Sequence, residues 1–255
     1  MAVKSKIVLI LILVVAFVVS AIVHLPIQAV LTHAPLPSQL KIAGASGSLW
    51  QGQVQQLQWQ HYNLGQVSWQ LQPMQLLTGN LQAKVRLGRG NPWQLRARGV
   101  VGYGLQGAYA EKVIASMPAT ELMKLAPPIP VPLDIAGQLE LSIESLQYAS
   151  PYCRAGKGNL VWNSDQIGTP LASLQVGPVS ADLSCKESNI KVQGKQQSKQ
   201  VTSEFSLDLQ ANRQYSAKAW FSPQPELPTA FAEQLKWLPK PDNQGRYQFS
   251  YRGRL

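Results

Sequence analysis

Charged residues, cysteine and histidine are all scarce in this chain of 255 residues. Asp, Glu, Lys and Arg make up 14% of the sequence, which holds two Cys and three His, whereas about a quarter of a typical soluble domain is charged. So few Cys and His exclude a structural zinc cluster. Because 45% of the residues are hydrophobic, the composition also excludes disorder, which requires low hydrophobicity together with high net charge.

Acidic residues are the rarer of the two charged classes. Thirteen Asp and Glu stand against 23 Lys and Arg, which gives a net charge of +10 and a pI near 9.7, a balance also found in nucleic-acid-binding proteins. The cations are spread along the chain, however, and many occupy alternate positions of strand-like segments, as Lys84 and Arg86 do. We therefore favour a cationic polar face of a sheet over nucleic-acid binding.

The amino terminus carries the longest apolar run. Lys4 and Lys6 precede residues 7–25, which contain no charged residue, and the next charge is Lys41. A helix over 7–25 would be about 28 Å long, close to the hydrocarbon core of a bilayer. We predict an uncleaved transmembrane anchor. The alternative is a cleaved signal peptide, because the small residues at 19–21 resemble a processing site.

The orientation of this anchor follows from the positive charges before it. Loops that carry Lys and Arg near a span stay in the cytoplasm, and both nearby lysines precede the run. The sequence therefore predicts a cytoplasmic tail at 1–6, a single inner-membrane span at 7–25, a linker at 26–43, and residues 26–255 in the periplasm of a Gram-negative cell.

The two cysteines, Cys153 and Cys185, both lie in the part of the chain expected outside the cytoplasm. Disulfides persist in such oxidising compartments, and a bridge closing this loop would stabilise the fold by roughly 3–4 kcal/mol on the chain-entropy model. We favour the bridge, and two buried free thiols are the alternative. The absence of a Cys-x-x-Cys pair argues against a redox-active role.

Apolar and polar residues alternate in many segments of the remaining chain. This period of two predicts strands with one buried face, and it recurs at 67–71, 81–87, 139–143, 205–211 and 247–251. A helical period occurs at 119–125 and at 228–238, each bordered by Pro. We expect a mainly β fold in which an antiparallel sheet curls into a groove, with two short helices.

An internal repeat connects these elements. Trp162 follows Trp50 by 112 residues, and Pro228 follows Pro118 by 110. Such a constant offset predicts two tandem units, each a run of strands with one short helix and a closing strand. The predicted units cover residues 44–145 and 153–255.

No set of residues in the sequence predicts catalysis. His24 and His33 border the apolar run, and His61 stands beside Tyr62 without a nearby acid. Nucleophile-elbow, zinc-protease and Walker-type motifs are all missing. We therefore expect no enzymatic activity, no metal and no cofactor. The tryptophans of the first unit either fill a thin core, which we favour, or line an open groove: Trp50, Trp59, Trp69 and Trp93.

Three segments resemble the type II secretion system protein N family of Gram-negative bacteria. The matching residues are Ser48, Leu49, Trp50 and Gly52 in the first segment, Gly65, Val67 and Trp69 in the second, and Tyr247, Phe249 and Tyr251 in the closing strand. The resemblance implies a non-enzymatic inner-membrane component that acts with other components of this secretion machine. The architecture is more distantly similar to the AsmA-like group, which implies a groove that binds lipid.

These two relationships leave two functional hypotheses from different classes. One is a scaffold that contacts periplasmic partners through strand edges, for which the closing strand with Tyr247, Phe249 and Tyr251 is the candidate edge. The other is a lipid-binding module for envelope biogenesis. A groove lined by apolar side chains would favour the lipid module, and a filled groove would favour the scaffold.

Overall fold

The computed structural model describes residues 10, 13–14, 17, 20, 24–33, 37–125, 134–164, 166–169 and 172–254. The cytoplasmic tail and most of the candidate anchor at 7–25 lie outside these described residues. Within the described part of the chain, no helix is both long and apolar enough to cross a membrane.

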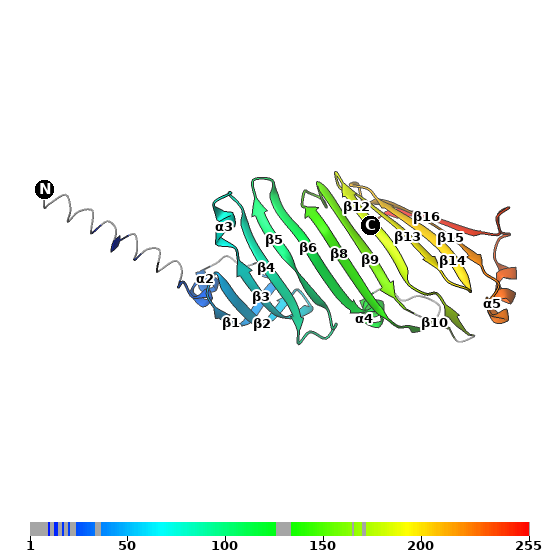
Figure 1. The fold of residues 1–255 in the computed structure, drawn as a ribbon, viewed down its shortest axis with the longest axis horizontal. Coiled ribbons are helices and arrows are strands. Elements are labelled where there is room, and N and C mark those ends of the chain that lie inside the picture. Colours follow the sequence, from blue (N-terminus) through cyan, green and yellow to red (C-terminus); the bar gives the residue numbers. More distant parts are fainter. Residues whose placement is uncertain are drawn as a thin grey trace. The chain divides into compact units, whose positions relative to one another are not determined.

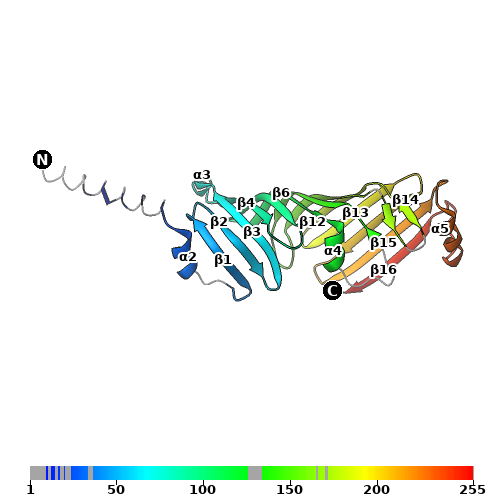
Figure 2. The same ribbon diagram turned by 90° about the horizontal axis from the view of Figure 1, so that it is seen from below.

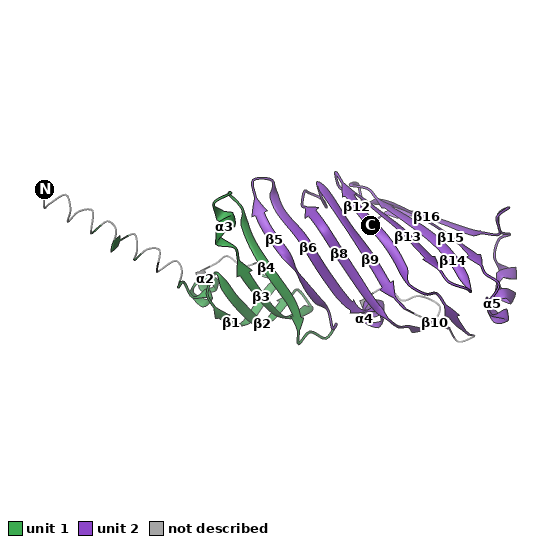
Figure 3. Cartoon of the chain, in the orientation of Figure 1, with its two compact units in different colours: residues 1–92 green, residues 93–255 purple. Residues whose placement is uncertain are grey.

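The chain forms two compact units, residues 1–92 and 93–255 (Figure 3). These units are defined by contacts in space. They do not test the tandem units 44–145 and 153–255, which remain a prediction.

Unit 1 contains a sheet of antiparallel strands in the order β1-β2-β3-β4. Its strands are β1 (Leu40–Gly47), β2 (Gln51–Trp59), β3 (Tyr62–Leu71) and β4 (Leu81–Arg89). Two helices that we did not expect accompany the sheet: α2 (Ile27–His33) precedes β1, and α3 (Pro73–Leu76) connects β3 to β4 (Figure 1). α3 is too short to show a helical period, and α2 lies directly after the apolar run, in the segment that we expected to be a linker.

Unit 2 contains a larger antiparallel sheet in the order β5-β6-β8-β9-β12-β13-β14-β15-β16. Its strands are β5 (Arg96–Gly104), β6 (Gly107–Pro118), β8 (Gln138–Gln147), β9 (Ala155–Asn163), β12 (Val179–Lys186), β13 (Asn189–Gln197), β14 (Val201–Leu209), β15 (Gln214–Pro223) and β16 (Tyr247–Arg254). A small separate sheet has the order β11-β10-β7. Its strands are β7 (Asp134–Ile135), β10 (Gln166–Gly168) and β11 (Ser173–Gln175).

The two helices predicted from the sequence are confirmed. They are α4 (Ala119–Leu125) and α5 (Thr229–Gln234), the latter continued by the short 3₁₀ helix η1 (Leu235–Trp237) (Figure 2). Along the chain, α4 and the short β7 stand between β6 and β8, and α5 with η1 stands between β15 and β16. In both cases the strands on either side of the helix pair directly with each other.

The strands β12, β13 and β14 of unit 2 present one apolar and one polar face. Leu183, Val192 and Leu207 are paired across β12, β13 and β14, and so are Asp182, Gln193 and Ser206 on the opposite face. Full burial is therefore rare. The buried apolar side chains among the described residues are Ile27, Val54, Ala119, Cys153, Val176, Ala181 and Val201.

Glycines opposite aromatic residues recur in both sheets. In β13, a Cβ on Gly194 would overlap the ring of Phe205, its partner in β14. An aromatic ring laid over a cross-strand glycine covers the backbone that the missing side chain exposes. This is how a sheet with so few buried side chains packs its apolar face. The pairs are Gly52 with Trp69, Gly102 with Tyr109, Gly194 with Phe205, and Gly253 with Tyr215.

The tryptophans expected in the core differ in their surroundings. Trp50 and Trp69 are half-buried, whereas Trp59 is 42% exposed. Trp59 is therefore not a core residue, because it lies at the end of β2, where the sheet turns into β3. In unit 2, Trp162 is half-buried and its indole N–H donates to the Ala136 carbonyl at 3.0 Å.

Candidate functional site

The turn between β1 and β2 gathers the first family motif. The Ser48 N–H donates to the Gln51 carbonyl at 2.9 Å, and the Ser48 hydroxyl accepts from the Gln51 N–H at 3.2 Å. The Leu49 N–H donates to the carbonyl of Leu25 at 3.0 Å, and Pro26 forms an isolated β-bridge with Ser48. The motif turn is therefore bonded to the chain just after the candidate anchor.

Trp69 joins the second motif to the first. Its indole N–H donates to the Leu49 carbonyl at 3.0 Å, and its ring covers Gly52, where a Cβ would lie 2.5 Å from the ring. Val67 pairs with Val54, one of the few buried residues. The structure thus brings together most of the motif residues of unit 1 at one end of its sheet.

Gly65 lies away from the β1–β2 turn, whereas Trp50 is part of that turn. Gly65 lies along β3 with φ of +72°, where a side chain would meet the Arg89 carbonyl, so the glycine is required by a close backbone approach. Trp50 uses its carbonyl to accept the Leu71 N–H at 2.7 Å. The motif therefore has a structural explanation, which is that it fixes the turn and the strands beside it.

α2 covers the outer edge of β1. The side-chain amide of Gln28 donates to the Ala45 carbonyl at 2.9 Å, and Ile27 is 6% exposed. The segment expected as a linker at 26–43 thus holds a helix that packs on unit 1.

β16 is the last strand in the order of the unit 2 sheet, as far as the chain is described. Within the described residues it pairs with β15 alone. The Gln214 carbonyl at the start of β15 points toward β14, because it accepts the Gln210 N–H. Peptide groups alternate in direction along a strand, so the next residue of β15 and every second residue after it point toward β16. The register then directs the peptide groups of Phe249 and Tyr251 toward β15 and leaves those of Gln248, Ser250 and Arg252 at the free edge.

Aromatic side chains on one face of β16 contact those of β15, although Phe249 and Tyr251 remain 45% and 65% exposed. The Phe221 ring stacks between Tyr247, at 5.1 Å between centroids, and Phe249, at 5.9 Å. The Tyr215 ring lies 5.9 Å from that of Tyr251. Burial, followed by the neighbouring Tyr251 phenol, raises the pKa of Tyr215. All three residues named from the sequence as the candidate edge therefore pack on β15, and the free hydrogen-bonding groups belong to the residues between them.

Asp242 fixes the start of β16. Its carboxylate accepts from the backbone N–H groups of Gln244 and Arg246, each at 2.9 Å, from the Arg246 guanidinium at 2.9 Å and from the Gln248 amide at 2.7 Å. The Arg246 N–H bond has the largest effect, and together these donors hold the pKa of Asp242 well below its ordinary value of 3.8 although partial burial opposes this. Sequence inspection missed this residue, whose only local signal is a Pro-Asp-Asn turn.

A pH dependence follows from Asp242. Because its pKa is lower in the folded state, the ionised carboxylate stabilises the fold above the unfolded value of 3.8, and this contribution is lost as the pH falls below that value. We expect the amides of Gln244 and Arg246 to lose hydrogen-exchange protection in acid, and Asp242→Asn to show the weaker protection already at neutral pH. Equal protection in parent and variant at neutral pH would disprove this role.

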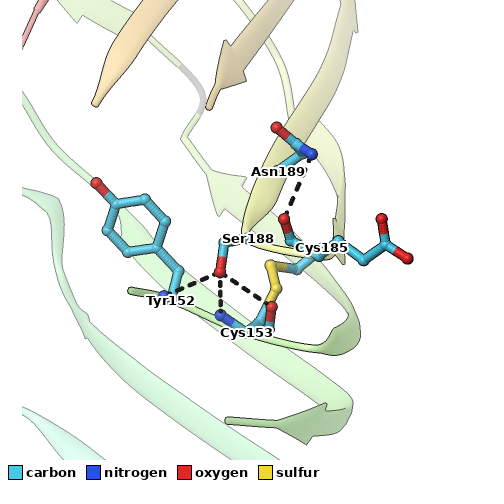
Figure 4. The surroundings of a disulfide bond; sticks show 6 residues. Tyr152, Cys153, Cys185, Ser188 and Asn189 are labelled. Carbon is cyan, nitrogen blue, oxygen red and sulfur yellow. Dashed lines mark hydrogen bonds between the residues drawn. A yellow bond between two sulfur atoms is a disulfide. The ribbon is translucent and has the colours of Figure 1, made fainter. Parts of the chain in front are cut away.

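The two cysteines form a disulfide, with 6.3 Å between their Cα atoms (Figure 4). This fits the pairing that the sequence favours. Next to it, the β12–β13 turn has positive φ at Glu187 and Ser188, a conformation that usually calls for Asn and Gly. Ser188 is 4% exposed; its N–H donates to the Cys153 carbonyl at 2.7 Å, and its hydroxyl accepts from the Tyr152 N–H at 3.3 Å.

The polar face of unit 2 lines a hollow of about 770 Å³. Side chains from β12 to β16 line it, among them Asp182, Lys195, Glu204, Lys218 and Gln248. Phe205, Trp220 and Phe249 line it as well, so the lining mixes charged and amide groups with aromatic ones and is not the mainly apolar lining that an acyl chain requires.

The remaining candidate residues show no catalytic arrangement. Within the described ranges, no three His, Cys, Asp or Glu side chains lie close enough together to hold a metal ion. His61 is exposed in the β2–β3 turn, with its ring 3.9 Å from that of Tyr62. His24 bonds to the Ser20 carbonyl at 2.9 Å.

Comparison with known proteins confirms the family resemblance. The family model "Type II secretion system (T2SS), protein N" matches residues 38–250. The chain is 45% identical over 236 residues to the type II secretion system protein N of Vibrio cholerae serotype O1, covering 92% of this chain and 93% of the relative. It is 35% identical over 254 residues to the protein of that name from Aeromonas hydrophila, covering 99% and 100%. No solved structure matches the chain. The chain therefore belongs to the type II secretion system protein N family.

Proposed function

We propose that this secretion-system component is held in the inner membrane by residues 7–25, and that it acts in the periplasm without catalysis by adding the free edge of β16 to the sheet of another component. Family membership supports action with other components of the system. The observation that carries the docking proposal is the row of backbone groups at the outer edge of β16.

The anchor is supported by charge and by exposure. Lys4 and Lys6 precede the apolar run. Four of the described positions within the run carry large apolar side chains that are at least half exposed, as expected for side chains that face lipid: Ile10, Leu13, Val14 and Phe17.

Fusion of alkaline phosphatase after Leu255 tests the topology. Because this enzyme requires export to become active, we expect an active fusion and a mature chain that keeps residues 1–25. An inactive fusion would refute the orientation. An amino terminus beginning near Ile22 would show a cleaved signal peptide instead of an anchor.

The β16 edge suits docking by strand addition. An unpaired edge offers alternating N–H and C=O groups that a second strand can continue. The side chains at Arg252 and Arg254 are exposed, and charges on an edge strand discourage indiscriminate pairing. The edge therefore favours a partner strand whose side chains can pair with these cations.

Ser250→Pro tests the docking proposal. Proline removes the outward N–H at this position while the pairing of Phe249 and Tyr251 with β15 remains. We expect the variant to be made, folded and inserted in the membrane as the parent is, but to lose co-purification with its partner and to secrete folded substrates several-fold less. Ser250→Ala, which keeps the N–H, is the matched control and should behave as the parent.

A contradictory result would be equally clear. If Ser250→Pro and Gln248→Pro both secrete and co-purify as the parent does, the edge of β16 is not the docking surface. A Ser250→Pro variant with a melting temperature lowered well below that of Ser250→Ala would show instead that proline disturbs the pairing with β15.

Lipid binding is the second candidate function. It is supported by the apolar face of unit 2, where Leu183, Val192 and Leu207 are only half-buried. Mass spectrometry of the intact protein purified in mild detergent would detect a retained lipid. A lipid bound in stoichiometric amount, and lost when Leu207→Gln is introduced, would support this function.

A further inference from the structure

We infer that the loop around α3, residues 72–81, inserts its apolar side chains into the surface of the same membrane that holds the anchor, so that unit 1 has a second lipid contact. This inference rests on the proposed anchor. The loop, called the α3 loop below, presents four large apolar side chains to solvent: Met74, Leu76, Leu77 and Leu81.

Two of these apolar side chains are almost fully accessible to solvent. Met74 is 75% exposed and Leu77 is 82% exposed. A contiguous exposed apolar patch marks a surface that contacts a partner or a membrane. No residue of α3 is buried, so its apolar side chains remain accessible at the surface.

The α3 loop lies at the end of the sheet that meets the candidate anchor. α3 follows β3 directly, and the last residue of β3, Leu71, bonds to Trp50 in the motif turn. The neighbouring residue of that turn, Leu49, bonds to Leu25 at the end of the apolar run. Figures 1 and 2 both show α2 and α3 at the same end of unit 1.

The charge pattern identifies the occupant as lipid. No Asp, Glu, Lys or Arg occurs between Lys41 and Lys84, so the loop can enter an apolar phase without burying a charge. The first cations after it, Lys84 and Arg86, are exposed on β4. Lys84 lies three residues beyond Leu81, about 10 Å along the strand, so its long side chain can reach the polar headgroups when Leu81 is at the hydrocarbon boundary.

Spin labelling of the full-length protein tests the insertion. Leu77→Cys is labelled and reconstituted in vesicles of phosphatidylethanolamine with a minority of phosphatidylglycerol. The bridged Cys153 and Cys185 do not react with the label, which the unlabelled parent verifies. His61→Cys, in the exposed β2–β3 turn at the opposite end of the sheet, is the matched control.

We expect the label at position 77 to be reached by oxygen and to be several-fold less accessible to a water-soluble nickel chelate than the label at position 61. Equal access of the chelate to both labels, with the protein resistant to alkaline extraction, would overturn the inference and leave the anchor intact. Exclusion of both reagents from position 77 would indicate protein packing and would also overturn it. Release of the protein by alkaline extraction would refute the anchor itself.

Discussion

Replacing Cys153 and Cys185 by serine is expected to lower the free energy of unfolding of unit 2 by about 3–4 kcal/mol, because the bridge limits the conformations of the unfolded loop between positions 32 residues apart. The effect should extend to the β12–β13 turn. Ser188 is held there in a left-handed conformation by bonds to Cys153 and Tyr152.

Hydrogen exchange of the purified protein measures this effect by strand. In the double Cys→Ser variant we expect faster exchange of the amides of β9, β12 and β13, and unchanged exchange in β2 and β3 of unit 1. Equal acceleration in both units, or none, would contradict the account. Alkylation of both cysteines in the non-reduced, denatured parent would show that the bridge does not form.

Gly194→Val is expected to destabilise unit 2 by about 2–3 kcal/mol, the upper part of the range for overpacking. The glycine is buried under the Phe205 ring, which occupies the place of its missing side chain. A β-branched residue ordinarily favours a strand, so a loss of stability here reports the clash with the ring.

A double-mutant cycle isolates that clash. In a Phe205→Ala background the space over Gly194 is open. We expect Gly194→Val to lower the free energy of unfolding by less than about 1 kcal/mol in that background. Urea denaturation of the four proteins gives the coupling. If Gly194→Val lowers stability equally with and without the Phe205 ring, the backbone requires the glycine and the aromatic partner does not.

The sequence predicted the helices α4 and α5 and strands at 67–71, 81–87, 139–143, 205–211 and 247–251, which overlap β3, β4, β8, β14 and β16. α4 and α5 are bordered by proline, and the strand at 247–251 alternates clearly. α3 was missed because its 4 residues are too few to show a helical period. α2 has 7 residues, as α4 does, and was missed because its apolar residues follow the apolar run directly, within the segment assigned as a linker. The small strands β7, β10 and β11 were missed because they have only 2 or 3 residues each.

The sequence predicted which strand forms the candidate edge, but not which of its peptide groups face outward. The last alternating strand of a chain is a natural choice for an unpaired edge, and β16 is one. Which of its peptide groups face outward depends on the register with β15 and on the β14–β15 turn. Cross-strand relations such as Gly52 with Trp69 likewise join residues that the sequence alone does not connect.

Photocrosslinking in cells that contain the whole secretion system tests the central claim most directly. A photoreactive amino acid is placed at Ser250 on the β16 edge and, as a matched control, at Glu204, which is exposed on the same face in the interior strand β14. We predict an adduct with another component of the secretion system from position 250 and none from position 204. Absence of an adduct at position 250, or an equal yield of the same adduct from position 204, would contradict docking through this edge.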